Sequence, residues 1–185
     1  MMIRMRMRSS FFAASVAAVI VAVSGSSRAD GSIIARPGAH PGYVLDLEPH
    51  LLLGTRDGLG GDNGYWGPGV RGTLVLVDNG FVKTINNSVG LGVGLDYLNY
   101  KHGSAFFVPV VMQWNFFLSD GWSVFGEPGV GFVLGEGGSG ATRRRDDRLI
   151  DLNIAVGGRY LFSNKLALTM RVGWPAATIG VSFLY

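Results

Sequence analysis

Cysteine is absent from all 185 residues, so no disulfide bond holds this chain together. Charged residues are also scarce, at 16% of the sequence, whereas hydrophobic residues make up 48% and glycine occurs 29 times. Beyond residue 29, no apolar run reaches the roughly 20 residues that a membrane-spanning helix requires. Such a chain is stabilised either by its own core or by a bilayer. In a bilayer, without spanning helices, its strands have to form a closed barrel.

The first 29 residues have the features of a cleaved signal peptide. Three arginines precede a mostly apolar stretch at residues 11–23, which is too short to span a membrane as a helix. Ser27 and Ala29 then supply the small residues that signal peptidase requires at positions −3 and −1. We therefore expect the chain to be exported and cleaved after Ala29.

Cleavage changes the charge of the chain. The net charge of +3 includes four arginines from residues 1–29, which leaves 12 basic and 13 acidic residues and a net charge of −1. Nucleic-acid binding requires a clustered positive field, so we predict no nucleic-acid partner. Residues 30–42 contain glycine, proline and histidine without periodicity, and we interpret them as a short periplasmic lead-in to one domain at 43–185.

Alternation of apolar residues with polar or small ones recurs through that domain, and a period of two is that of a β-strand. Residues 88–97 show it most clearly, because Val, Leu and Tyr alternate there with glycine and Asp96. Alternating segments of about ten residues joined by turns are typical of a transmembrane barrel. We expect eight strands, at about 43–55, 66–77, 88–97, 106–118, 122–134, 150–162, 166–172 and 177–185.

Four prolines conflict with this pattern: Pro49, Pro68, Pro109 and Pro128. Each falls inside an expected strand, where it removes a ladder hydrogen bond, and a closed barrel offers no free edge to accommodate it. We expect them to mark either bulges or strand ends.

The polar face of the strands separates two kinds of barrel. A soluble lipocalin-like barrel also alternates, but it turns its apolar face inward around a ligand. Here the polar face is rich in glycine and carries charges of both signs, which suits paired side chains in a narrow lumen. The residues that we predict to form a polar lumen network are Asp46, Glu48, Arg71, Asp96, Glu127, Asp151, Arg159 and Arg171.

Aromatic residues fall near both ends of the expected strands. Two aromatic girdles are typical of a barrel that crosses two membrane interfaces. The outer girdle is predicted to contain Trp66, Tyr97 and Trp174, and the periplasmic girdle Tyr43, Trp122, Tyr160, Phe162 and Tyr185.

The final run places Phe183 and Tyr185 on one face and ends on the aromatic Tyr185. In this respect the chain resembles bacterial outer-membrane β-barrels, whose last strand ends in an aromatic residue that the barrel-assembly machinery recognises. Residues 43–185 as a whole are similar to the outer membrane protein A-like and X-like domains of Gram-negative bacteria. The resemblance implies an all-β, eight-stranded, antiparallel up-and-down barrel in the cell outer membrane, in contact with lipid and lipopolysaccharide. It implies a structural or surface-interaction role, and a barrel of this size is filled by side chains instead of forming an open pore.

Few residues suggest chemistry. The spacing of His102 and Ser104 resembles that of the catalytic pair in outer-membrane lipid A deacylases, but no carboxylate is placed to orient the histidine, and a polar loop is the simpler interpretation. His40, His50 and His102 lack metal-ligand spacing, so we predict no metal and no cofactor. Residues 143–145 and Arg148 are arginines that either bind lipopolysaccharide phosphates or form a solvated loop. We therefore predict a non-enzymatic membrane protein, with a lipid-modifying hydrolase and a soluble periplasmic ligand-binding barrel as alternatives.

Overall fold

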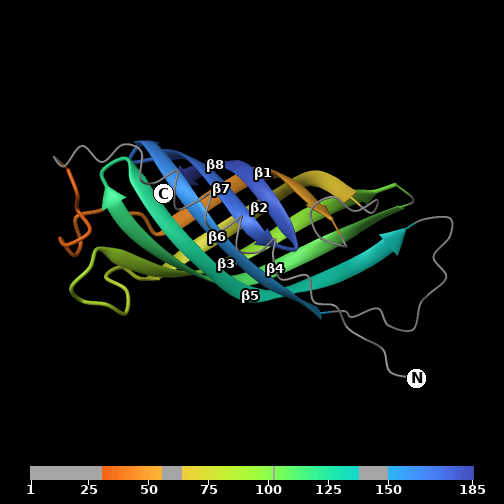
Figure 1. The fold of residues 1–185 in the computed structure, drawn as a ribbon, viewed down its shortest axis with the longest axis horizontal. Helices are drawn as coiled ribbons and strands as arrows, with labels where there is room; N and C mark the ends of the chain where they lie inside the picture. Colours follow the sequence, from red (N-terminus) through yellow and green to blue (C-terminus); the bar gives the residue numbers. More distant parts are fainter. Residues whose placement is uncertain (1–30, 56–63, 102, 138–149) are drawn as a thin grey trace, which may run out of the picture. The chain divides into compact units, whose positions relative to one another are not determined.

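The strands form a closed antiparallel barrel in sequence order (Figure 1). A computed structural model describes residues 31–55, 64–101, 103–137 and 150–185, and the predicted signal peptide lies outside this range. Each strand pairs with its neighbours in sequence, and β1 pairs with β8 to close the barrel. The strands are β1 (Leu45–Thr55), β2 (Gly64–Val77), β3 (Asn87–Tyr100), β4 (Gly103–Ser119), β5 (Trp122–Gly137), β6 (Ile150–Ser163), β7 (Leu166–Trp174) and β8 (Ala176–Leu184). The predicted fold class is confirmed.

Within the described residues, no helix is long and apolar enough to cross a membrane.

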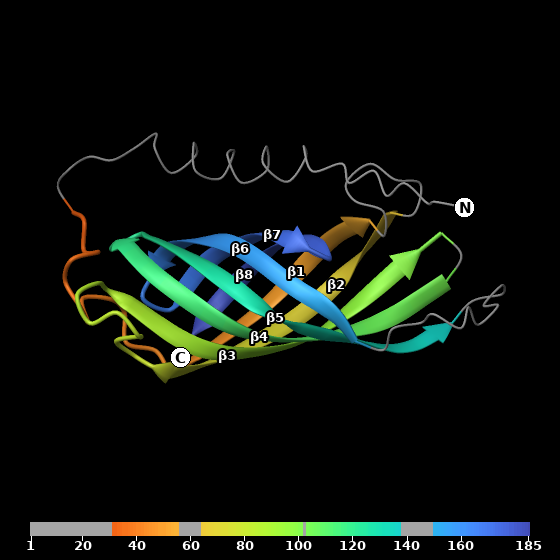
Figure 2. The same ribbon diagram turned by 60° about the horizontal axis from the view of Figure 1, so that its bottom comes forward.

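The connections divide the barrel into two ends. At the turn end, residues 78–86, 120–121 and 164–165 join the strands, and the chain terminates beside them (Figure 2). At the loop end, the β1–β2 and β5–β6 connections lie outside the described residues, and β7 is joined to β8 by Pro175 alone. Connections that alternate between two ends are expected for an up-and-down barrel with an even number of strands, whose first and last strands begin and end on the same side.

The four prolines lie in mid-strand, so the prediction that they mark bulges or strand ends was wrong. On one side each proline is paired: Pro49 with Val70, Pro68 with Leu51, Pro109 with Gly131 and Pro128 with Ile154. Toward the other neighbouring strand, the proline has no paired residue, although the residues farther along the strand on either side of it are paired in register. None of the four register shifts in the described strands lies at a proline. In an antiparallel ladder, one residue exchanges its backbone hydrogen bonds with only one neighbouring strand. Each proline therefore interrupts a single strand pairing, and the other pairing holds the register.

The interruption at Pro68 explains why the preceding residue, Gly67, is a glycine. Gly67 precedes Pro68 on β2, and the carbonyl oxygen of Tyr97 lies where a β-carbon of residue 67 would be. On the same strand, a β-carbon at Gly72 would meet nothing within 4 Å. Only the first of these two positions therefore requires glycine for space.

We expect Gly67→Ala to lower the free energy of unfolding by about 1–3 kcal/mol, the usual cost of an added methyl group that forces the backbone to move. Gly72→Ala is the matched control, and we expect it to change stability by about 0.5 kcal/mol or less. Urea titration of both variants in detergent micelles measures the difference. Equal effects would contradict the close backbone approach at Gly67.

Candidate functional site

The barrel is polar inside and apolar outside. Its lumen contains fully buried charged groups, such as Glu127 and Arg159 at 0% exposure, whereas apolar residues such as Val93 and Leu95 are each 47% exposed on the exterior. In a water-soluble protein, charged residues are almost never fully buried and large apolar residues gather in the core. The reversed distribution requires an apolar solvent around the strands.

Exposed aromatic residues lie near both ends of the strands. Trp66 and Tyr97 are exposed near the loop end, and Trp174 is half-buried there. Near the turn end, Tyr160 packs against Trp122 and Phe162, with ring centroids 4.9 and 5.1 Å apart, and Tyr185 is 68% exposed. This arrangement is that of two interfacial girdles, with Tyr43 as the exception discussed below.

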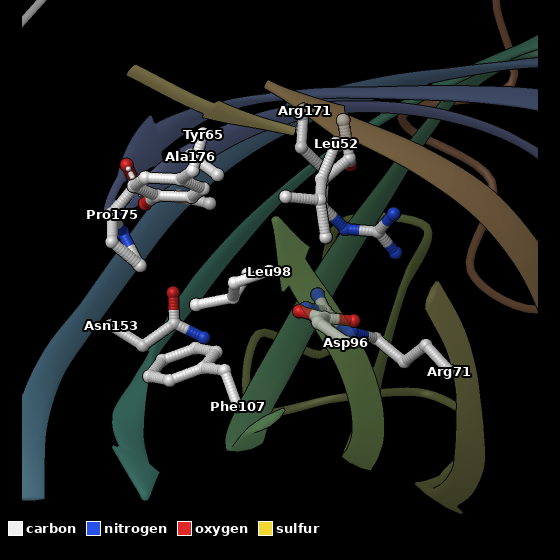
Figure 3. Close-up of a pocket in the computed structure, with 12 residues that line it drawn as sticks. Leu52, Tyr65, Arg71, Asp96, Leu98, Phe107, Asn153, Arg171, Pro175 and Ala176 are labelled. Carbon is white, nitrogen blue, oxygen red and sulfur yellow. Dashed lines mark hydrogen bonds between the residues drawn. The ribbon is translucent and has the colours of Figure 1, made fainter. Parts of the chain in front are cut away.

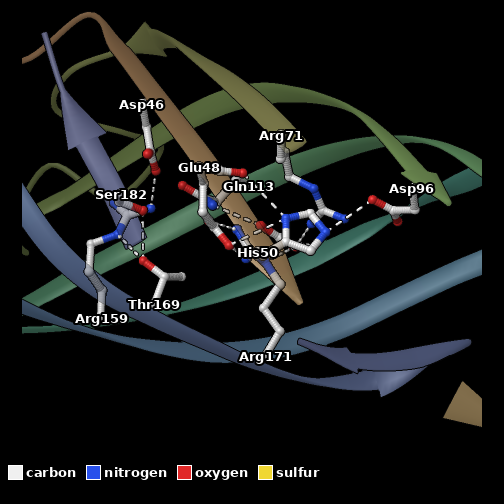
Figure 4. A network of polar contacts seen from close by, with 11 residues as sticks. Asp46, Glu48, His50, Arg71, Asp96, Gln113, Arg159, Thr169, Arg171 and Ser182 are labelled. Carbon is white, nitrogen blue, oxygen red and sulfur yellow. Dashed lines mark hydrogen bonds and ion pairs between the residues drawn. The ribbon is translucent and has the colours of Figure 1, made fainter. Parts of the chain in front are cut away.

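Arg171 on β7 is the centre of the lumen network (Figure 4). Its guanidinium group donates to both carboxylate oxygens of Glu48 and, through Nε, to Glu127 Oε2 at 2.8 Å. Glu127 also accepts hydrogen bonds from Arg71 Nη1 at 2.6 Å and from Gln113 Nε2 at 2.7 Å. Strands β1, β2, β4, β5 and β7 thus meet at one set of charge-assisted hydrogen bonds across the lumen.

A second group lies nearer the turn end, around Arg159 on β6. Its guanidinium group donates to Asp46, to the Tyr43 hydroxyl at 2.9 Å and, through Nε, to Thr169 Oγ1 at 3.3 Å. Thr169 is in turn hydrogen-bonded to Ser182 at 2.7 Å. The donors of a buried guanidinium group need acceptors, and each nitrogen of Arg159 has one here, from the segment before β1, from β1 and from β7.

Tyr43 corrects a prediction, because it was expected in the periplasmic girdle and is instead 8% exposed inside the turn end. The alternation that begins at Asp46 does not extend back to it, since Val44 and Leu45 are both exposed. β1 begins at Leu45, so Tyr43 belongs to the segment that crosses the end of the barrel. Burial raises the pKa of the Tyr43 phenol, while the positive charge of Arg159 acts in the opposite direction.

Phe125 lies between the two groups. The guanidinium carbons of Arg159 and Arg171 are 5.6 and 5.1 Å from the centroid of its ring. A cation over an aromatic face is stabilised by the ring quadrupole. One inward-facing aromatic residue therefore separates and partly stabilises two buried cations of like charge.

A third contact lies toward the loop end, where His50 Nε2 is 3.0 Å from Asp96 Oδ1. Asp151 was predicted to join the network but lies apart from it. It is half-buried near the start of β6, and its carboxylate accepts the backbone N–H of Leu152 at 2.8 Å. The reason is its position along the barrel axis. Asp151 pairs with Gly131 on β5, four residues closer to the loop end than Glu127, which belongs to the ion pairs.

Two apolar clusters enclose this polar region. At the turn end the cluster contains Ile33, Tyr43, Phe117, Leu161, Ala167 and Leu184. At the loop end it contains Leu52, Tyr65, Leu98 and Phe107. Polar groups in the middle are therefore separated from both ends of the lumen by packed apolar side chains.

A small cavity remains beside the loop-end cluster (Figure 3). Its volume is about 20 Å³, room for about one water molecule. Arg71 Nε and Thr178 Oγ1 are buried beside it and have no hydrogen-bond partner among the described residues. The cavity is too small for a ligand larger than a water molecule.

The remaining candidate residues are dispersed. Ser104 is half-buried at the loop end of β4, where it pairs with Asn99 and Gly137, while His102 lies outside the described residues. The arginines at 143–145 and Arg148 also lie outside the described residues. Phe183 and Tyr185 are exposed on the exterior at the turn end, at 39% and 68%.

Sequence reasoning left several lumen residues out of the predicted network, namely Tyr43, His50, Gln113 and Phe125. For three of them the signal was present: His50 and Phe125 share the parity of inward-facing carboxylates on β1 and β5, and Gln113 alternates with apolar residues on β4. The predicted network included charged residues only, so it omitted the amide of Gln113, the imidazole of His50 and the aromatic ring of Phe125. For Tyr43, alternation pointed to the wrong face.

No family model matches this chain, and no curated protein matches its sequence. Three solved structures are similar in fold. Ail, an outer membrane protein of Yersinia pestis, in a phospholipid bilayer nanodisc is 11% identical, with a TM-score of 0.48 over 78% of this chain and 100% of that chain. Ail in complex with the heparin analogue sucrose octasulfate is 10% identical, with a TM-score of 0.46 over 77% and 97%. A chain from the de novo design of transmembrane β-barrels is 15% identical, with a TM-score of 0.46 over 82% and 99%.

The strand order, the closed pairing and the reversed polarity of this chain define its class. It is a small eight-stranded barrel of the transmembrane type, with lipid-facing apolar residues and an ion-paired interior. A soluble ligand-binding barrel would carry the opposite distribution of side chains.

Proposed function

We propose that the protein is an integral protein of the cell outer membrane with a closed lumen, which serves envelope integrity or surface interaction through its loop end. The observation that carries this proposal is the combination of exposed apolar strands with fully buried ion pairs, such as that of Arg171 with Glu48 and Glu127. Only a closed barrel satisfies every backbone group in a bilayer without spanning helices. The predicted signal peptide supports export to this membrane.

Closure of the lumen rests on how its cross-section is filled. Arg171 and Arg71 reach Glu127 from different strands, and apolar clusters lie on both sides of this layer. A solute would have to break buried pairs, each of which costs about 3–5 kcal/mol to disrupt. We therefore propose a barrel that holds shape and position in the membrane instead of a diffusion pore.

The proposal is tested by membrane fractionation, by comparison of heated and unheated samples on a gel, and by conductance in planar bilayers. We expect the protein in the outer-membrane fraction, a shift in mobility on heating because a bilayer-stabilised barrel resists detergent, and no stable ion conductance. Recovery in the soluble periplasmic fraction would overturn the membrane assignment. Steady single-channel currents would overturn the closed lumen.

We also propose that the protein is not a hydrolase. Ser104 is half-buried at the loop end of β4, away from the apolar mid-belt where a lipid ester would be anchored. The test is ester hydrolysis by the intact protein beside Ser104→Ala and His102→Ala. We expect no activity above the buffer blank in any of the three. Hydrolysis that is lost in both variants would establish the enzymatic alternative.

For partners, we propose lipopolysaccharide at the loop end and the barrel-assembly machinery at Phe183 and Tyr185 during biogenesis. Both aromatic side chains are exposed, and the Tyr185 backbone exchanges hydrogen bonds with Leu45, donating at 2.8 Å and accepting at 3.0 Å. Substitution of the side chain leaves these backbone bonds intact, whereas deletion of the residue would remove them.

We expect Tyr185→Ala to reduce the amount of assembled barrel in cells severalfold while changing the free energy of unfolding of refolded protein by about 0.5 kcal/mol or less. The physical reason is that an unclosed barrel exposes strand edges that aggregate or are degraded, so poor recognition acts on yield before stability matters. Tyr160→Ala is the matched control. It removes ring contacts with Trp122 and Phe162, so we expect a larger loss of stability and a smaller loss of assembly. The same order in both assays would show that Tyr185 is an ordinary structural residue.

A further inference from the structure

The segment at residues 32–43, which precedes β1, is docked against the turn end of the barrel. Ser32 forms a bridge with Ser119, and the backbone N–H of Ile33 donates to the carbonyl oxygen of Leu118 at 3.1 Å. The Ile34 carbonyl oxygen accepts the N–H of Asn86 at 2.7 Å. In Figures 1 and 2 this segment, in orange, lies at the same end as the 78–86 connection and the C-terminus.

Side chains of this segment pack against the apolar cluster at the turn end of the barrel. Ile33 is 3% exposed and belongs to the turn-end apolar cluster with Phe117, Leu161 and Leu184. His40 stacks on the Phe117 ring, with centroids 4.3 Å apart and planes 9° from parallel, and its Nε2 lies 3.0 Å from the carbonyl oxygen of Asp78. These contacts reach β4, β6, β8 and the β2–β3 connection, so they can form only once those strands have come together.

We propose that residues 32–43 are a strap that seals the turn end of the barrel against water after the strands have closed. The polar group directly behind it is the one that most needs such a seal. Arg159, Asp46 and Ser182 are at most 1% exposed. Tyr43, at the end of the strap, precedes β1, and its hydroxyl accepts a hydrogen bond from Arg159, which also donates to Asp46. The strap thereby keeps the Arg159–Asp46 ion pair in a low-dielectric environment, where the pair is strongest.

The proposed sealing role of the strap rests on the proposed closed lumen, but the experiments that test it do not measure conductance. Because the chain contains no cysteine, single cysteines report accessibility without a background. Ile33→Cys places a thiol at the buried contact, and Ala35→Cys places one on an exposed residue two positions away. In the folded protein in liposomes, we expect a membrane-impermeant maleimide to label Ile33→Cys at least about tenfold more slowly than Ala35→Cys, because labelling requires local opening. Equal rates would mean that the segment is not docked and would overturn the proposal.

A second experiment asks whether the docked segment seals the lumen. Ser182→Cys is nearly isosteric and places a thiol at a position of 0% exposure behind the strap. We combine it with Ile33→Asp, which puts a carboxylate in the apolar contact, and with the matched control Ala35→Asp at the exposed site. We expect a small methanethiosulfonate reagent to label Ser182→Cys about tenfold faster in the Ile33→Asp background than in the control, with both proteins still shifting on heating. Equal labelling with Ile33→Cys protected would show a docked segment that does not seal, and would overturn the sealing role. If Ile33→Asp does not fold, Ile33→Ser, which puts a smaller polar group in the same contact, takes its place against Ala35→Ser, with the same expected difference and the same contradicting outcome.

Discussion

Arg171→Met is expected to lower the free energy of unfolding by about 3–5 kcal/mol, the cost of leaving a buried charge without its partner. Arg171 donates to Glu48 and to Glu127, and it is 2% exposed. Glu127 keeps Arg71 and Gln113 as donors, so the carboxylate that loses most is Glu48. Urea titration in detergent micelles measures the loss.

Two controls separate this loss from nonspecific damage. Lys165→Met removes an exposed cation at the turn end, and we expect a change of about 0–1 kcal/mol. The double variant Glu48→Met with Arg171→Met removes the stranded carboxylate as well, and we expect it to recover much of the stability, because a buried pair replaced by apolar groups of similar size is often neutral. A single-variant loss within the surface range would mean that the lumen is wet and its charges are screened.

Val93→Arg is expected to impair insertion and to destabilise the barrel by about 2–4 kcal/mol, the cost of a basic residue on the lipid face at the middle of the bilayer. Val93 lies midway along β3 and is 47% exposed on the exterior. The charge would replace an apolar side chain where no water is available to solvate it.

The control for depth is the same substitution at the end of a strand. Val77 is the last residue of β2, at the turn end, and is 39% exposed. There Arg reaches the interface, so we expect Val77→Arg to cost about 0–1 kcal/mol. Folding yields into liposomes and urea titrations compare the two variants. Equal costs at the two depths would contradict the assignment of the exterior to lipid.

Much of the barrel was determined by local sequence. Alternation in a run such as residues 88–97 both identifies a strand and assigns its faces, because successive side chains point to opposite sides. For that reason strand number, strand order and the inward position of Arg71, Arg159 and Arg171 were predictable, and the strand limits differed from the prediction by only a few residues. Because consecutive strands pair along the barrel, only its closure, the pairing of β1 with β8, requires a long-range contact.

The tertiary structure alone decided the level of each residue along the barrel axis and the contacts that form when the barrel closes. Alternation assigns a residue to the lumen but not to a level in it, so Asp151 shares the inward parity and still lies above the ion pairs that join Arg171 to Glu48 and Glu127. Tyr43 turns inward because the chain crosses the end of the barrel before β1 begins, where no strand period applies. The four prolines are tolerated because each removes hydrogen bonds to only one neighbouring strand, which depends on the register that closure sets. The sequence by itself therefore determined a barrel with a charged lumen, whereas the pairing of those charges and the sealing of the turn end arose only when distant strands were brought to the same level.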